Sequence, residues 1–220
     1  MIRWYDVPSN LASPSFEEAF RWFTLRAQIF FEEAYAPYVG ATSMAASPSV
    51  IGLWLTIAHT CRPCYIYETG TGASTILFQN WATMTGRTIE HYHAEDNKHW
   101  LKQLRSVAAQ HYDLPTIVSY EEFWMRIHPT ASKLFLMDGF RDHRINHAEK
   151  LVPYQENSFF IFDDANRAKT QAQINSLFDK KLGRLIEPVA RDEHGRYAAV
   201  WMGRLFPATS DMMSDLYSLK

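Results

Sequence analysis

The sequence predicts an α/β protein built on a doubly wound, mostly parallel sheet of seven strands. Seven short candidate strands recur along the chain, and helical patterns separate most of the first five. A polar turn over residues 190–195 joins the last two strands, which favours an antiparallel hairpin at one edge of the sheet. The expected strands are residues 64–68, 88–94, 116–119, 134–138, 159–162, 183–188 and 197–201.

Two helices are expected before the first strand. Ser15 and Glu18 have the spacing of a capping box, and apolar residues continue at helical spacing to about Tyr35. After a loop, Ser47 and Pro48 suit the N-cap and the first position of a second helix that contains residues 50–59. This second helix is the more apolar of the two, so we expect it to pack on the sheet.

Composition indicates one soluble domain over residues 1–220. A chain of 220 residues that is 47% hydrophobic can form a single packed core. We divide it into N-terminal helices with their loop (1–62), the alternating core (63–205) and a C-terminal tail (206–220). The 22 basic and 24 acidic residues are spread along the chain, so nucleic acid is not an expected partner. No apolar run has the length of a membrane span and no signal peptide is evident, so we expect no membrane association and a cytoplasmic location.

The chain has two cysteines, Cys61 and Cys64, in a Cys-x-x-Cys arrangement. A redox pair and half of a zinc site are the functional alternatives. The pair ends a helix and precedes a strand, however, and no second cysteine pair exists to complete four thiolates. We therefore expect two reduced thiols in a tight turn.

A glycine turn follows the first expected strand, in the sequence Glu68-Thr-Gly-Thr-Gly-Ala-Ser-Thr75. Glycines let a backbone turn tightly and approach a ligand, and the following helix N-terminus offers unpaired N–H groups. An acid before the first glycine, with no third glycine, departs from the dinucleotide fingerprint. It would repel a pyrophosphate and suits a cationic or hydroxyl-rich ligand, and S-adenosylmethionine has both an ammonium group and ribose hydroxyls. Glu95 follows about twenty residues later, the spacing at which a carboxylate accepts hydrogen bonds from ribose, which leaves NAD as an alternative.

Acidic residues recur where the expected parallel strands end. Because ligands of open α/β sheets bind beyond the carboxyl ends of the strands, these acids are candidates for a site. They are Glu68, Glu95 or Asp96, Glu121 or Glu122, Asp138, and Asp163 with Asp164. His143 and His147 come shortly after the fourth strand and are candidate bases.

Four segments together resemble class I S-adenosylmethionine-dependent methyltransferases, over roughly residues 44–202. They are Tyr67-Glu-Thr-Gly-Thr-Gly-Ala-Ser-Thr75, Tyr92-His-Ala-Glu-Asp-Asn-Lys-His-Trp100, Phe135-Leu-Met-Asp-Gly139 and Phe160-Ile-Phe-Asp-Asp-Ala-Asn-Arg167. The resemblance implies a Rossmann-like core with S-adenosylmethionine as cofactor. Carried over, the cofactor-binding residues are Glu68, Gly70, Thr71, Gly72, Ser74 and Glu95.

The N-terminal helices and the loop 42–46 resemble the lid of the catechol O-methyltransferase branch. In that branch a methionine before the apolar helix lies near the cofactor, and Met44 has that relative place. A loop methionine that only covers the apolar helix is the alternative.

The resemblance also raises the question of a metal. In the magnesium-dependent branch, an acid after the fourth strand and two oxygen-bearing residues after the fifth bind Mg²⁺, and Asp138, Asp163 and Asp164 occupy these places. The same acids could serve without a metal. A closer likeness, to uncharacterised relatives with a DG…R…DDA.R pattern, names no substrate; within it we expect Arg167 to form a structural ion pair with a nearby acid.

The sequence thus predicts a methyltransferase that acts on an oxygen of a small molecule or sugar, with Asp138 and His143 as catalytic residues. Two alternatives stay open: an NAD-dependent oxidoreductase, and a methyltransferase-like protein that binds a ligand or partner without turnover. Trp4 and Tyr5 are suited to line either a pocket or a homodimer interface, and the sequence does not choose between them.

Overall fold

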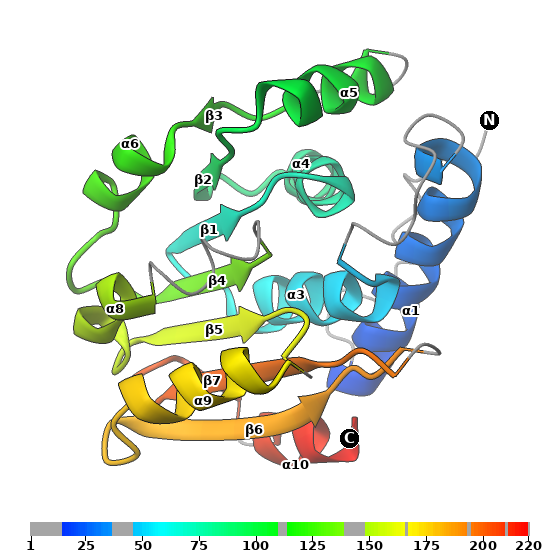
Figure 1. Ribbon diagram of the computed structural model, residues 1–220. Coiled ribbons are helices and arrows are strands. Elements are labelled where there is room, and N and C mark those ends of the chain that lie inside the picture. The colour runs from blue at the N-terminus through cyan, green and yellow to red at the C-terminus, as the bar shows by residue number, and fades with distance from the viewer. Residues whose placement is uncertain are drawn as a thin grey trace.

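The sheet has seven strands in the order β3-β2-β1-β4-β5-β7-β6. This computed structural model describes residues 15–36, 46–109, 114–138, 148–165, 167–192, 195–209 and 211–219. β7 runs antiparallel to its neighbours β5 and β6, and the other neighbouring pairs are parallel (Figure 1). The predicted strands and edge hairpin are therefore confirmed. The strands are β1 Tyr65–Thr69, β2 Glu90–Ala94, β3 Ile117–Val118, β4 Lys133–Met137, β5 Ser158–Phe162, β6 Gly183–Val189 and β7 Ala198–Gly203.

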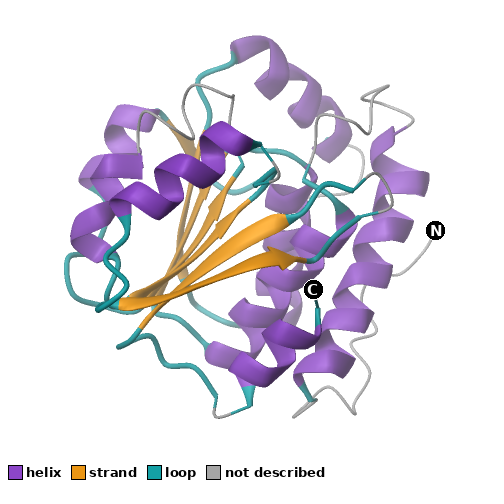
Figure 2. Ribbon diagram, turned by 60° about the horizontal axis from the view of Figure 1, so that its bottom comes forward, coloured by secondary structure: helices purple, strands orange, loops and turns teal. Residues whose placement is uncertain are grey.

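Helices cover both faces of the sheet, which makes three layers (Figure 2). On one face, α1 Phe16–Phe30, α3 Pro48–Cys61, α4 Ala73–Thr85, α5 Lys98–Ala108 and α10 Met212–Ser218 share one hydrophobic cluster. On the other face lie α6 Tyr120–Met125, α8 Ala148–Leu151 and α9 Ala168–Leu177. A π-helical turn, Phe31–Tyr35, continues α1, and a 3₁₀ turn, Val152–Tyr154, follows α8.

The N-terminal helices begin where their capping residues predict. The Ser15 side chain accepts a hydrogen bond from the Glu18 N–H at 3.3 Å, and the Ser15 N–H donates to the Glu18 carboxylate at 2.9 Å. This completes the predicted capping box. Ser47 caps α3 by accepting from the Val50 N–H at 3.3 Å, with Pro48 as the first helical residue.

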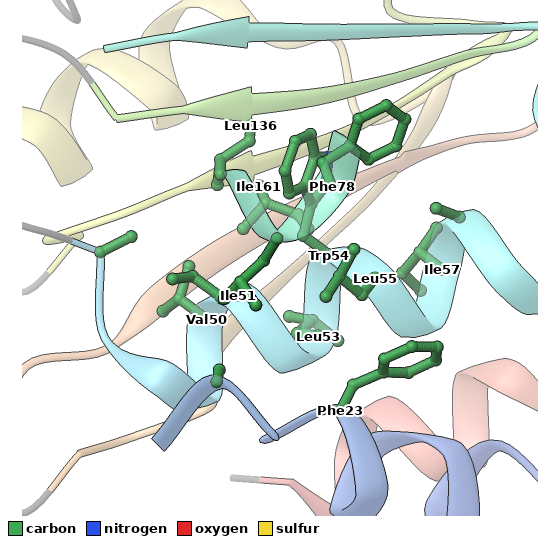
Figure 3. Close-up of a cluster of buried hydrophobic side chains, with 14 of the residues drawn as sticks. Phe23, Val50, Ile51, Leu53, Trp54, Leu55, Ile57, Phe78, Leu136 and Ile161 are labelled. Atoms are coloured by element: carbon green, nitrogen blue, oxygen red, sulfur yellow. The ribbon is translucent and has the colours of Figure 1, made fainter. Parts of the chain in front are cut away.

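Helix α3 lies between the sheet and α1, and its apolar side chains point both ways (Figure 3). Trp54 is fully buried and packs against Phe78 of α4 with ring centroids 5.0 Å apart. On the opposite side, Gly52 lets α1 approach so closely that a Cβ at this position would come within 2.8 Å of the Thr24 backbone. An amphipathic helix needs one apolar face, whereas α3 is apolar almost all round because it is covered on both sides.

Cys61 and Cys64 are free thiols, as predicted; Cys61 is buried and Cys64 is exposed. Burial raises the pKa of the Cys61 thiol, as expected of an inert buried cysteine. The segment expected as a tail contains α10, whose Met212 and Leu216 are fully buried against the rest of the fold. Among the described helices, none is long and apolar enough to cross a membrane.

Candidate functional site

The candidate site lies at the carboxyl ends of β1, β2, β4 and β5, where backbone hydrogen bonds join the loops that follow the strands. The Gly70 N–H donates to the Ala94 carbonyl at 3.0 Å, and the Asp138 N–H donates to the Thr69 carbonyl at 2.9 Å. β1 and β4 are neighbours from which the chain order runs outward in opposite directions. This is the switch point at which open α/β sheets bind ligands. The fold thus brings the glycine turn, Glu95, Asp138 and Asp163 to one edge.

The glycine turn connects β1 to α4 and has a conformation that its sequence explains. Gly70 has φ of 82°, a left-handed conformation that glycine adopts without strain. The Gly72 N–H donates to the Thr75 hydroxyl at 2.9 Å, which closes the first turn of α4. Thr71 is buried, and its hydroxyl has no hydrogen-bond partner within the described part of the chain. The turn therefore presents an unused hydroxyl beside the helix N-terminus.

Glu68 lies beneath this turn and is completely buried. Its Oε1 accepts a hydrogen bond from the Ser74 hydroxyl, and its Oε2 accepts one from the Thr75 hydroxyl at 2.7 Å. The Nδ1 of His93, also fully buried, makes a third contact with Oε2. A buried carboxylate is tolerated when its lone pairs are satisfied in this way.

This network gives Glu68 a structural role in the glycine turn, because its oxygens accept hydrogen bonds from Ser74 and Thr75. The cofactor contact expected of Glu68 stays a prediction. Thr75 links the Gly72 N–H to Glu68, so the carboxylate fixes the shape of the glycine turn from below. The Ser74 hydroxyl donates its hydrogen to Glu68, and the lone pairs of the Ser74 oxygen are left to accept a hydrogen bond from a ligand. No local pattern pairs His93 with Glu68; His93 is fully buried and its ring centroid lies 5.8 Å from that of Phe78 on α4.

Two aromatic residues that sequence reasoning did not select lie against the glycine turn. The Trp100 indole N–H, on α5, donates to the Thr71 carbonyl. Tyr35, at the end of the π-helical turn, is fully buried, and its ring centroid lies 6.5 Å from that of Trp100. Both approach Gly72: a Cβ there would lie 3.4 Å from the Tyr35 hydroxyl and 3.9 Å from the Trp100 ring. No local pattern marks these contacts, because they join three separate parts of the chain.

Glu95 directly follows β2 and is half-buried. Its backbone N–H donates to the Val118 carbonyl at 3.3 Å, and its carboxylate accepts from the Asn97 N–H at 2.8 Å. The Gly70 N–H is hydrogen-bonded to Ala94, which immediately precedes Glu95. Glu95 and the glycine turn therefore lie at adjacent strand ends, as predicted.

The three aspartates proposed for Mg²⁺ are buried at the same edge but are engaged differently. One Asp138 oxygen accepts from the Ala46 N–H at 3.1 Å, just before α3. Asp164 has φ of 52° and pairs with Arg167 at 2.7 Å, which confirms the structural ion pair expected of Arg167. Asp163 and Asp164 also lie near enough to Arg196 to favour its charged form.

Across the described ranges, no group of three or more His, Cys, Asp or Glu side chains is arranged to hold a metal ion. The Mg²⁺ site predicted at Asp138, Asp163 and Asp164 is therefore not supported. Arginine guanidinium groups already supply positive charge to the acids after β5, where the metal was expected to do so.

Several predicted residues lie outside the described part of the chain. They include Met44, expected near the cofactor, and the candidate bases His143 and His147. Trp4 and Tyr5, considered for a pocket or a dimer interface, are also among them.

Comparison with solved structures shows what this architecture is similar to. A methyltransferase of Podospora anserina bound to S-adenosylhomocysteine matches with a TM-score of 0.55 at 12% identity, covering 89% of each chain. An O-methyltransferase of Bacillus cereus in complex with S-adenosylhomocysteine matches with a TM-score of 0.51 at 14% identity, covering 88% of this chain and 93% of that one. The precorrin-6y C5,15-methyltransferase of Geobacter metallireducens matches with a TM-score of 0.53 at 10% identity, covering 76% and 96% respectively.

No protein-family profile and no characterised protein sequence matches this chain. The similarity is therefore one of fold. The protein has the Rossmann-like fold of class I S-adenosylmethionine-dependent methyltransferases, with the parallel core and antiparallel β7 that the sequence predicted.

Proposed function

We propose that this protein is an S-adenosylmethionine-dependent methyltransferase that transfers a methyl group to an oxygen of a small molecule or sugar in the cytoplasm. The observation that carries the proposal is the placement of the glycine turn beside Glu95 at the switch point of the sheet. In this proposal Glu95 accepts hydrogen bonds from the ribose hydroxyls. Gly70, Thr71, Gly72 and Ser74 hold the amino-acid part of the cofactor, with Glu68 maintaining the turn.

The charge at the site favours this cofactor over NAD. Burial raises the pKa of Tyr35, and the nearby Asp138 and Glu68 raise it further, so these two acids contribute negative potential beside the glycine turn. That potential would attract the sulfonium and ammonium groups of S-adenosylmethionine and oppose the pyrophosphate of NAD. The departure of the glycine turn from the dinucleotide fingerprint supports the same choice.

In the reaction, an acceptor oxygen attacks the methyl carbon, the carbon–sulfur bond breaks, and its electron pair stays on sulfur to give S-adenosylhomocysteine. The acceptor hydroxyl loses a proton, which we assign to Asp138 or His143. Most of the rate enhancement would come from alignment of oxygen, methyl carbon and sulfur in the closed site. We assign no step to Mg²⁺, because the described acids do not form a metal site.

Isothermal titration with S-adenosylhomocysteine and with NAD, each with Mg²⁺ or EDTA, tests the proposal. We expect micromolar binding of S-adenosylhomocysteine, weak or no binding of NAD, and no effect of EDTA. Glu95→Ala should weaken binding by about 10- to 100-fold, the loss of a hydrogen bond to a charged group. Glu90→Ala is the matched control, because Glu90 lies exposed at the opposite end of β2. No binding by the wild-type protein in any condition would contradict the proposal.

A further inference from the structure

The helix that begins at Phe16 changes its hydrogen-bonding pattern just before it reaches the candidate site. Over Phe31–Tyr35 it is π-helical. Such turns are rare and occur frequently at functional sites. Here the residue at the end of the turn is Tyr35, which lies beside Gly72 at the start of α4.

The buried Tyr35 hydroxyl lacks a well-formed hydrogen bond to the described part of the chain. Tyr35 has no exposed surface, and its hydroxyl makes no hydrogen bond of standard geometry within the described part of the chain. Burial of an unpaired hydroxyl destabilises a fold, so each such group calls for an explanation. The Thr71 hydroxyl, in the adjacent glycine turn, is also buried and unpaired among the described residues. Two unused hydroxyls thus flank Gly72, which indicates that a ligand completes their hydrogen bonds.

The surroundings define which atoms of a ligand would suit Tyr35. Burial, with Asp138 and Glu68 nearby, raises the pKa of Tyr35, while the Ala73 backbone N–H partly opposes that rise. The hydroxyl therefore stays protonated and, with the Ala73 N–H on its oxygen side, has its own hydrogen left to donate. The first turn of α4, a helix of 13 residues, adds a partial positive charge that favours an anionic acceptor.

An amino acid carries an ammonium group and a carboxylate on the same carbon, and the residues around Tyr35 include partners for both groups. Asp138 supplies a carboxylate for an ammonium group, while the hydroxyls at the start of α4 supply donors for a carboxylate. Glu68 competes little for these hydroxyls, because its oxygens already accept from the Ser74 and Thr75 hydroxyls and contact the Nδ1 of His93.

We propose that the Tyr35 hydroxyl donates a hydrogen bond to the carboxylate of the amino-acid part of S-adenosylmethionine, which makes Tyr35 a cofactor-binding residue supplied by the N-terminal helix. This inference rests on the proposed function and extends it to a residue that neither the motifs nor the fold assigns. Trp100 connects Tyr35 to the glycine turn, because its ring packs near Tyr35 and its indole N–H donates a hydrogen bond to the Thr71 carbonyl.

Tyr35→Phe tests the inference, because it removes the hydroxyl and keeps the ring that packs near Trp100. Affinities are measured by titration with two ligands: S-adenosylhomocysteine, and its decarboxylated analogue, which retains the ammonium group. We expect Tyr35→Phe to weaken S-adenosylhomocysteine by about 10- to 100-fold and the analogue by less than twofold. Without ligand, the variant should melt at or above the wild-type temperature, because an unpaired buried hydroxyl has been removed.

Tyr154→Phe is the matched control, since Tyr154 is half-buried in the segment that leads into the amino end of β5. It should bind both ligands as the wild type does. Equal affinity of wild type and Tyr35→Phe for S-adenosylhomocysteine would overturn the inference and leave the proposed function intact. Equal weakening of both ligands would overturn it as well, because the hydroxyl would then not act through the carboxylate. If the wild-type protein binds neither nucleoside, the proposed function fails and this inference fails with it.

Discussion

Single residues decide whether the glycine turn keeps its shape, and Glu68 is the clearest case. The acid was selected from its place before Gly70, yet its partner His93 lies on another strand, 25 positions away. Sequence spacing identified an important carboxylate and suggested a ligand contact. Only the three-dimensional structure shows that the contact is internal, because β1 and β2 bring Glu68 and His93 opposite each other in register.

Replacement of Glu68 by glutamine should destabilise the folded protein. The amide nitrogen of Gln is a donor, and it would replace a carboxylate oxygen that accepts from the Ser74 or Thr75 hydroxyl. A buried donor left unsatisfied costs about 1–3 kcal/mol, so the free energy of unfolding should fall by this amount. Urea denaturation gives the value. Glu122→Gln is the control, because the exposed Glu122–Arg126 pair contributes little; an equal loss in both variants would contradict a buried network.

Among whole elements, the strands and the starts of the two N-terminal helices were predicted well, whereas the π-helical turn was not. The strands were found because most are short runs of β-branched, aromatic or other apolar residues between turn residues, a pattern that is visible without tertiary knowledge. The capping residues Ser15 and Ser47 likewise act locally. The π-helical turn at Phe31–Tyr35 was not predicted, because its apolar residues continue the helical spacing of α1; its contact with Trp100 joins residues 65 positions apart.

The contact between α1 and α3 also depends on a single small residue. Gly52→Ala should raise helix propensity by about 1 kcal/mol, but the new methyl group would meet the backbone of Thr24. Crowding of this kind costs about 1–3 kcal/mol or more, because one helix must shift. We expect a net loss of stability in urea denaturation. Ser106→Ala, at an exposed position in α5, should be neutral or slightly stabilising. A gain of stability in Gly52→Ala would show that α1 can move freely from α3.

At the scale of the whole molecule, the two helical layers differ in what they contribute to the candidate site. One face holds a ladder of aromatic rings, with Tyr67 stacked between Tyr92 and Phe135 on neighbouring strands at centroid distances of 5.6 and 4.8 Å. The opposite face carries α1, α3, α4 and α5. This layer contributes Tyr35, Trp100 and the start of α4 to the candidate site. The aromatic face stabilises the sheet, and the face with the N-terminal helices shapes the site.

The stability of the whole molecule should also depend on pH through His91, which lies in β2 beside Phe78 of α4. Burial lowers the pKa of His91 to about 4, and the neighbouring His93 adds to this lowering. A histidine in the unfolded chain has a pKa near 6.5, so below that pH His91 binds a proton in the unfolded state but stays neutral in the folded protein. The stability contributed by neutral His91 is thus complete above pH 6.5 and is lost as the pH falls toward 4.

His91→Leu should therefore lose less stability than the wild type when the pH is lowered from 7.5 to 5.0. The urea midpoint measured at both values gives the comparison, and partial exposure of the side chain will moderate the difference. His99→Leu, on the exposed surface of α5, serves as control and should keep the wild-type pH dependence. If the His91→Leu midpoint falls as steeply as that of the wild type, acid destabilisation arises elsewhere, and the packing of β2 against α4 does not limit stability at low pH.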